Sequence, residues 1–172
     1  GATGHWECES TSWDRPIEAN STEKASDYHS RFLNYIAADA KQCIGSFVFL
    51  WGQKQERTPT WYGLFLDNNK CTEAAQVMQY LWTGKWAEHR VPQIGKLKVN
   101  GMLAEESISL QQGHIYSATI DIKYSGKSLS YRWELMKEVD RELQSDEDPA
   151  RRGRSGGRCE GEAVKCSGPD WS

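Results

Sequence analysis

An uninterrupted apolar run over residues 43–51 stands out in the hydrophobic pattern of this chain. The run contains neither proline nor charge, and it ends abruptly in Trp51, a glycine and a polar cluster. Its length and composition predict a strand that is buried on both faces, as in parallel sheets. Ligand-binding groups in parallel α/β folds lie just past the carboxyl ends of strands. Trp51, Gln53, Gln55 and Glu56 therefore stand where a binding site is expected.

Before this run, the pattern changes to a helical period. Asn20, followed three residues later by Glu23, has the spacing of a capping box at a helix N-terminus. From Tyr28 to Ala40 an apolar residue recurs every four positions. Together these features predict an amphipathic helix over about residues 22–41.

After the run, a polar and aromatic loop leads to a second helical stretch. Thr72 is placed to cap its N-terminus, and Gly84 follows its last apolar residue. The spacing predicts a helix over about residues 72–84. Helix, buried strand, loop and helix in this order are typical of a βα repeat.

Beyond Pro92 the period shortens to two. Short alternating segments begin at residue 94 and continue to residue 135, with glycines between them as turns. Such segments predict an antiparallel β-sandwich. The boundary between the two patterns falls near residues 88–92, which divides the chain into segments 1–90, 91–143 and 144–172.

The last segment, 144–172, lacks the material for a core. After Leu143 the only aliphatic residue larger than alanine is Val164. Such a segment cannot bury enough apolar surface to offset the entropy of ordering it. Its composition favours a disordered tail over a basic, anion-binding tail, because its acidic residues nearly cancel its arginines. The abrupt change after Leu143 also leaves open a tail translated out of frame.

Charge and cysteine content narrow the functional classes. The net charge of -3 provides no basic field, so nucleic acid is a poor default partner. None of the five cysteines has the spacing of a metal site, and the odd count argues against a disulfide framework. No apolar stretch has membrane length, and no motif for a cofactor or a hydrolytic triad is present. We therefore expect no metal, no cofactor and no membrane span.

Two stretches resemble a known family. The strings GSFVFLWGQKQERTPTWYGLF (45–65) and TEAAQVMQYLWTGKW (72–86) resemble the end of the catalytic barrel in bacterial glycoside hydrolases of the family 2 and family 5 type. The segment 92–135 resembles an Ig-like or PKD-like module, and such modules often follow these barrels. The implied fold is α/β plus all-β. It consists of the last βα units of a (β/α)8 barrel, a partial Ig-like antiparallel β-sandwich and a disordered tail.

The resemblance also implies a place in the barrel for each element. The 43–51 strand would be the eighth strand, the 72–84 helix the eighth helix and the 22–41 helix the seventh. A whole barrel of this kind needs about 250 residues. The chain would therefore hold about the last quarter and would depend on the rest of the barrel as its partner. The parent enzyme would be periplasmic or secreted.

The chemistry implied is hydrolysis of a β-linked glycan with retention, which uses two carboxyl groups about 5–5.5 Å apart. The resemblance puts the acid/base far upstream of Gly1 and the nucleophile directly before it. Glu7 is the second candidate nucleophile, with a solvated loop carboxylate as its alternative. The chain alone is therefore expected to be inactive.

The expected substrate-binding residues are mainly aromatic. In the family resembled, an aromatic residue at the position of Trp51 floors the subsite where the bond breaks, and sugar faces stack well on indole rings. The further candidates each have an open alternative. Gln53 and Gln55 could be merely solvated loop residues, and His5 could be structural. The rings of Trp6, Trp61 and Tyr62 could instead pack at the edge of the core.

A different class of function, a non-catalytic carbohydrate-binding or scaffolding module, also fits a tryptophan-rich chain. Its aromatic residues should lie in the sandwich. Six of the eight tryptophans precede residue 92, however, and this distribution favours the barrel.

Overall fold

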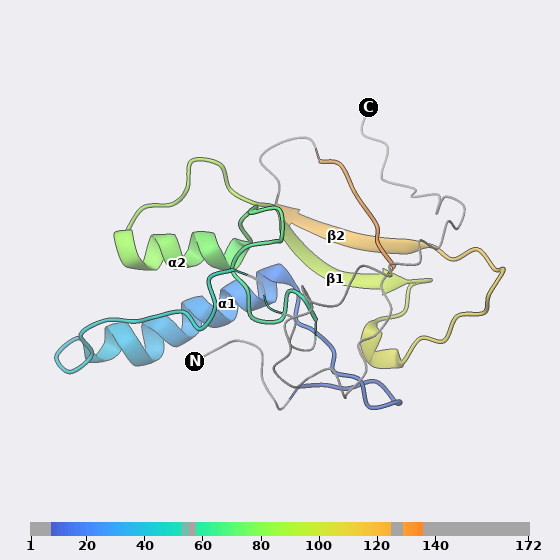
Figure 1. Cartoon of the computed structure of the whole chain (residues 1–172), viewed down its shortest axis with the longest axis horizontal. Helices are drawn as coiled ribbons and strands as arrows, with labels where there is room; N and C mark the ends of the chain where they lie inside the picture. Colours follow the sequence, from blue (N-terminus) through green and yellow to red (C-terminus); the bar gives the residue numbers. More distant parts are fainter. Residues whose placement is uncertain (1–7, 53, 55–57, 125–128, 136–172) are drawn as a thin grey trace, which may run out of the picture.

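The computed structural model describes residues 8–52, 54, 58–124 and 129–135 (Figure 1). Helix α1 (Ser21–Arg31) continues into a π-helical turn (Phe32–Ile36) and a 3-10 turn (Ala37–Asp39). Helix α2 (Glu73–Thr83) lies beside α1, and the strands β1 (Gln93–Val99) and β2 (Ala118–Tyr124) follow. A short 3-10 turn (Ala104–Glu106) lies between the strands.

The predicted first helix is confirmed, with its capping box. The Asn20 side chain accepts hydrogen bonds from the backbone N–H groups of Thr22 and Glu23, and the Glu23 carboxylate accepts one from the N–H of Asn20. These bonds satisfy backbone donors that have no partner inside the helix. Regular α-helix ends at Arg31, and residues 32–39 remain helical in a wider and then a tighter turn.

The predicted second helix is also confirmed. Thr72 is the extended residue at its N-cap position, but its side chain makes no capping hydrogen bond, and its hydroxyl donates to the Leu64 carbonyl instead. Gly84 lies past the C-terminus with a φ of 71°. Its N–H donates to the carbonyl of Tyr80 at 2.7 Å. A glycine adopts this left-handed conformation without the steric penalty that a Cβ would bring.

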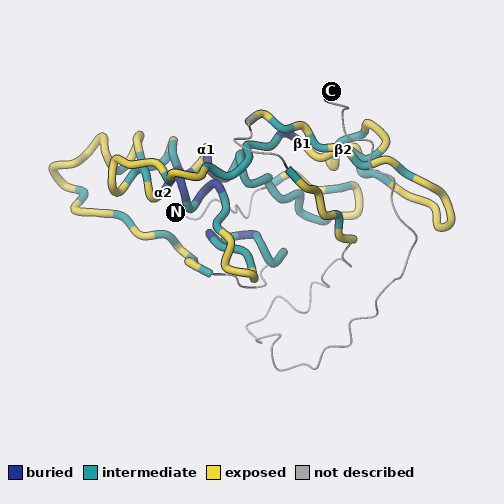
Figure 2. The backbone as a smooth tube through the Cα atoms, turned by 90° about the horizontal axis from the view of Figure 1, so that it is seen from above, coloured by how far each residue is buried: buried dark blue, intermediate teal, exposed yellow. Residues whose placement is uncertain are grey.

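The core lies between the two helices and the segment 61–65. Buried positions gather where α1 and α2 pack together (Figure 2). The buried apolar residues are Ala25, Tyr28, Trp61, Leu64, Ala74, Val77 and Met78. The apolar stripe of α1 and one face of α2 thus meet, as their periodicity predicts.

Alternation after Pro92 produces an antiparallel pair. Strands β1 and β2 pair with Val99 opposite Ala118 and Leu97 opposite Ile120. The predicted strands at residues 108–110 and 129–135 are wrong, because neither segment is in a strand. Among the described residues these segments have no ladder partner, and Leu135 is 98 % exposed. The sheet of the described residues has two strands, so the partial sandwich stays a prediction.

The prediction of a strand buried on both faces over residues 43–51 is wrong for this structure. The segment is irregular, with bends at Phe49 and Trp51, and it pairs with no strand of the described chain. Phe47 is 98 % exposed, and Trp51 is 62 % exposed. A strand is buried on both faces only where neighbouring layers cover both, and no described element covers the outer face of this segment.

A buried polar junction joins α1, α2 and β1. Glu73 is buried, and its carboxylate accepts hydrogen bonds from the Thr22 hydroxyl at 2.7 Å and from the Gln93 amide at 2.6 Å. Thr22 also accepts from the N–H of Ile94 at 2.8 Å, and the Asn20 amide donates to the Gly95 carbonyl. These bonds connect the two sides of the boundary predicted near residues 88–92.

Candidate functional site

A row of aromatic side chains lies on the outer face of the segment 47–51. We call it the aromatic strip, and its members are Phe47, Phe49, Trp51, Tyr62 and Phe65. The three side chains from the 47–51 segment are 98 %, 63 % and 62 % exposed, in that order. Contiguous exposed apolar residues of this kind mark ligand-binding or interaction surfaces.

Alternation of exposed and part-buried side chains along the segment positions the strip. Side chains at odd positions from 47 to 51 are exposed, whereas Ser46, Val48 and Leu50 are part-buried. Val48 packs against the core, and the Trp82 indole N–H donates to the Ser46 hydroxyl at 2.8 Å. These inward contacts attach the segment to the core and to α2, so the odd-numbered side chains point outward.

Pairs of rings connect the segment to its neighbour in the chain. Phe49 meets Tyr62 edge to face with ring centroids 5.0 Å apart, and Trp51 lies tilted against Phe65 at 4.8 Å. Both arrangements fall within the favourable range for aromatic pairs. The contacts restrict the rings while leaving much of Phe49 and Trp51 exposed.

Buried neighbours anchor the second part of the strip. Leu64 is 1 % exposed, and its carbonyl accepts hydrogen bonds from the N–H of Thr72 at 3.0 Å and from the Thr72 hydroxyl at 2.8 Å. Trp61 is 2 % exposed. With Trp61 and Leu64 directed inward, the part-buried Tyr62 and Phe65 form the edge of the strip.

The sequence predicts Trp61 and Tyr62 either as an outer sugar platform or as core-edge packing, and the structure places the two rings in different surroundings. The Trp61 ring lies in the core and presents no accessible face. Tyr62 stays with Trp51 on the outer side, through its contact with Phe49. The two rings of this Trp-Tyr pair therefore do not share one face.

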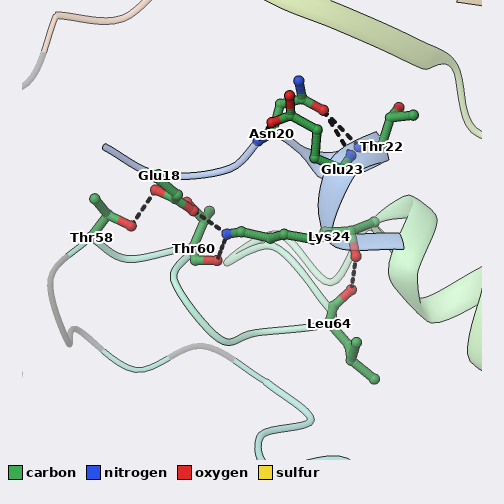
Figure 3. Close-up of polar contacts among 9 residues, drawn as sticks. Glu18, Asn20, Thr22, Glu23, Lys24, Thr58, Thr60 and Leu64 are labelled. Carbon is green, nitrogen blue, oxygen red and sulfur yellow. Dashed lines mark hydrogen bonds and ion pairs between the residues drawn. The ribbon is translucent and has the colours of Figure 1, made fainter. Parts of the chain in front are cut away.

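A polar cluster fixes the loop that leads to Trp61 (Figure 3). The Glu18 carboxylate receives hydrogen bonds from Lys24, from Thr58 and, at 2.8 Å, from the Thr60 hydroxyl. Lys24 also donates to the Thr60 carbonyl at 2.7 Å. With three donors on one carboxylate, Glu18 is engaged in structure, and its two oxygens have little capacity left for a substrate.

Sequence analysis missed Glu18, and little in its local pattern could have identified it. Its hydroxyl partners lie 40 and 42 residues away, in a loop without periodicity. The Glu18–Lys24 ion pair spans six positions, which is not a helical spacing. Only the folded chain brings these groups together.

Several predicted site residues lie outside the described residues. They are the candidate nucleophile Glu7 and the candidate substrate-binding residues His5, Trp6, Gln53 and Gln55. Within the described ranges, no group of three or more His, Cys, Asp and Glu is placed to hold a metal ion. No helix of that part of the chain is both long enough and apolar enough to cross a membrane.

Among the described residues, the shifted pKa values belong to an ion pair at β1 and not to the aromatic strip. Lys96 donates to Glu105 at 2.7 Å and lies 3.4 Å from a carboxylate oxygen of Glu23. The hydrogen bond to Glu105 raises the pKa of Lys96 and lowers the pKa of the Glu105 carboxyl. Segment 43–52 carries no charged residue. The face that it presents therefore offers stacking and apolar contact rather than ionic binding.

Comparison with known proteins adds no relationship. The chain matches no protein-family model, and a search of the curated proteins finds no match either.

Proposed function

We propose that the aromatic strip binds a β-linked glycan, with Trp51 as the principal stacking residue. The observation that carries the proposal is the state of this ring, which is 62 % exposed yet held against Phe65. A ring that is both accessible and restricted loses little conformational entropy on binding.

The chemistry of the strip suits a sugar. The face of a pyranose that carries its C–H bonds is apolar and flat, and it packs on an indole ring without desolvating a charge. Phe49 and Tyr62 extend the surface beyond Trp51, and Tyr62 adds a hydroxyl that can bond a sugar hydroxyl. The absence of charge from segment 43–52 favours a neutral ligand over an ionic one.

The wider proposal is that this surface forms the eighth-strand side of the cleft in a retaining glycoside hydrolase. It is supported by the likeness of residues 45–65 and 72–86 to that family and by the exposure of Trp51, the ring that this likeness assigns to the cleft floor. The resemblance puts neither catalytic carboxylate among the described residues, so the chain by itself is expected to bind a glycan without cleaving it. Glu18 and Glu73 do not replace them, because both are engaged in structural hydrogen bonds.

The second candidate is a non-catalytic carbohydrate-binding function. One observation favours it: the strip is assembled wholly from described residues and needs no carboxylate pair to hold a sugar. Sequencing the encoding DNA beyond both ends separates the two. An upstream frame with a glutamate after a barrel strand supports the hydrolase, and a start codon directly before Gly1 supports the binding module.

Binding is tested by titrating the full chain with soluble β-linked glucan, mannan and xylan oligosaccharides. Isothermal calorimetry measures the affinity, with an α-linked glucan oligosaccharide as the control ligand. We expect Trp51→Ala to weaken binding by roughly tenfold, which corresponds to about 1.4 kcal/mol of lost stacking. Trp13→Ala is the matched control, because Trp13 is also exposed, at 44 %, but lies outside the strip. Equal affinities of the two variants, or no binding of any β-linked oligosaccharide, would refute the proposal.

A further inference from the structure

We propose that Arg90, held against the aromatic pair of Tyr80 and Trp86, binds the carboxylate of a uronic acid residue in an acidic glycan. These residues belong to α2 and to the segment that connects it to β1 (Figure 1), and none of them is a member of the aromatic strip. The inference is independent of the glycan binding proposed above. It rests on a guanidinium group that is fixed in place and has no acceptor, and on an exposed aromatic ring beside it.

The end of α2 positions the two rings. Gly84 adopts its left-handed conformation and donates to the Tyr80 carbonyl at 2.7 Å, which turns the chain out of the helix. Trp86 then stacks on Tyr80, with ring centroids 4.2 Å apart and ring planes inclined by only 4°. This contact restricts both rings, while Trp86 stays 40 % exposed. The pair is therefore a fixed and accessible platform.

The buried Gln76 side chain fixes the backbone on both sides of Arg90. Its amide N–H donates to the His89 carbonyl at 2.7 Å, and its amide oxygen accepts from the N–H of Val91 at 2.9 Å. With its neighbours anchored to α2, Arg90 extends over Trp86, and its guanidinium carbon lies 3.6 Å from the ring centroid. The face of an indole ring attracts a cation electrostatically. The guanidinium is thus ordered before a ligand arrives, which lowers the entropy cost of binding.

The guanidinium group has unused hydrogen-bonding capacity. Its Nε is buried without a partner, and its two terminal nitrogens reach the surface, where no described residue accepts from them. No carboxylate of the described chain forms an ion pair with Arg90, and this includes Glu88, which stands two positions before it. A cation without a counterion attracts an anion with no competitor inside the protein. The arrangement therefore suits an anionic ligand.

Charge and shape favour a carboxylate as that anion. A planar guanidinium donates two parallel hydrogen bonds to the two oxygens of a carboxylate. The single positive charge of Arg90 balances the single negative charge of a carboxylate, whereas a phosphate monoester carries a charge of about −2. The stack thus matches a carboxylate in both geometry and charge.

The surroundings favour a sugar over a peptide as the carrier of the carboxylate. Residues 84–90 form no strand, so they offer no ladder to an extended peptide. The exposed part of Trp86 offers an apolar surface to a pyranose ring, and the exposed Lys85 and His89 offer hydrogen bonds to sugar hydroxyls. A uronic acid carries the ring and the carboxylate in one residue, so it can contact Trp86 and Arg90 together.

Calorimetric titration of the full chain provides the test. The ligands are a β-linked glucuronate oligosaccharide and its neutral glucose counterpart, in which a hydroxymethyl group replaces each carboxylate. At low salt the glucuronate should bind at least about tenfold more tightly than the neutral sugar, and sodium chloride should reduce the difference by screening the charges. Acetate, inorganic phosphate and a short peptide with a free C-terminus are the comparison ligands, and each should bind more weakly than the glucuronate.

Variants assign the preference to Arg90. Arg90→Gln should remove it, so that the charged and the neutral oligosaccharide bind with equal affinity. Arg132→Gln is the matched control, because it removes the same charge from a side chain that is 86 % exposed and lies outside the stack, and it should keep the preference. Circular dichroism verifies that each variant is folded, and the comparison of ligands on the wild type does not depend on any variant.

Four results would overturn the proposal. The first two are equal affinities of the wild type for the charged and the neutral sugar, and a folded Arg90→Gln variant that keeps the preference. The third is an Arg132→Gln variant that loses the preference as fully as Arg90→Gln, which would indicate attraction by net charge alone. The fourth is binding of acetate, phosphate or the peptide as tightly as the glucuronate, which would indicate a general anion site or a peptide site.

Discussion

Replacing Glu73 by glutamine should destabilise the fold through the junction of α1, α2 and β1. Glu73 is 3 % exposed, and both of its carboxylate oxygens accept hydrogen bonds, one from Thr22 and one from Gln93. Glutamine has the same shape but offers only one acceptor oxygen. In the Glu73→Gln variant, one of the two part-buried donors therefore faces an N–H group instead of an acceptor.

The expected loss of unfolding free energy follows from the number of hydrogen-bond donors left without an acceptor. A donor left without an acceptor beside the buried Glu73 side chain costs about 1–3 kcal/mol, less where water reaches the part-buried Thr22 or Gln93. Taking about 2 kcal/mol, the midpoint of thermal unfolding should fall by roughly 4–8 °C for a chain of this size. Thr22 also accepts from the N–H of Ile94, so the change weakens the attachment of β1 to both helices.

Thermal and urea unfolding, followed by circular dichroism at low protein concentration, measure this change. Glu88→Gln is the matched control, because it removes the same charge from an exposed residue that has no hydrogen bond or ion pair within the described structure. In a double-mutant cycle with Thr22→Val, the two substitutions should be non-additive by at least about 0.5 kcal/mol. The reasoning fails if Glu73→Gln unfolds within about 0.5 kcal/mol of the wild type, which is the ordinary range for surface substitutions.

Three further predictions concern local features. Asn20→Ala should cost about 1 kcal/mol of unfolding free energy by removing the N-cap of α1, and a urea midpoint equal to that of the wild type would contradict this role. Gly84→Ala should cost about 1 kcal/mol because of the φ of 71°, whereas Gly52→Ala, which is free of that strain, should be near neutral in the same assay. The Lys96–Glu105 pair should stabilise the fold by at most about 1 kcal/mol above the ordinary Glu105 pKa of 4.5, and this contribution should vanish as the pH falls through the lowered folded value. Glu105→Gln should therefore flatten the acid limb of the stability–pH curve, and an unchanged limb would show that the pair contributes nothing.

Features that depend on residues a few positions apart were predictable. The capping box of Asn20 and Glu23 depends only on residues within one helical turn, and so does the left-handed glycine after α2. The alternation that forms β1 and β2 is similarly local. Where the structure differs, at residues 43–51, 108–110 and 129–135, the prediction required a neighbouring strand that no described residue supplies.

In the candidate site, too, local features were predictable and contacts between distant parts of the chain were not. Trp51 stood out because it ends an apolar run, and it is exposed in the structure. Its contact with Phe65, and the choice of Tyr62 rather than Trp61 for the outer side, depend on how 61–65 packs against the helices. The Glu18 cluster was not predictable at all, because it joins groups that are distant in the chain.

The sequence by itself therefore determined where α1 begins, where α2 begins and ends, and that strands follow Pro92, since caps, periodicity and alternation act over a few residues. Only the tertiary structure decided which apolar residues are covered. Burial is a property of what packs against a surface, and two side chains with the same local pattern differ when a neighbouring element covers one and not the other. Trp61 and Trp51 differ for this reason, with one ring in the core and the other on the open face of the strip.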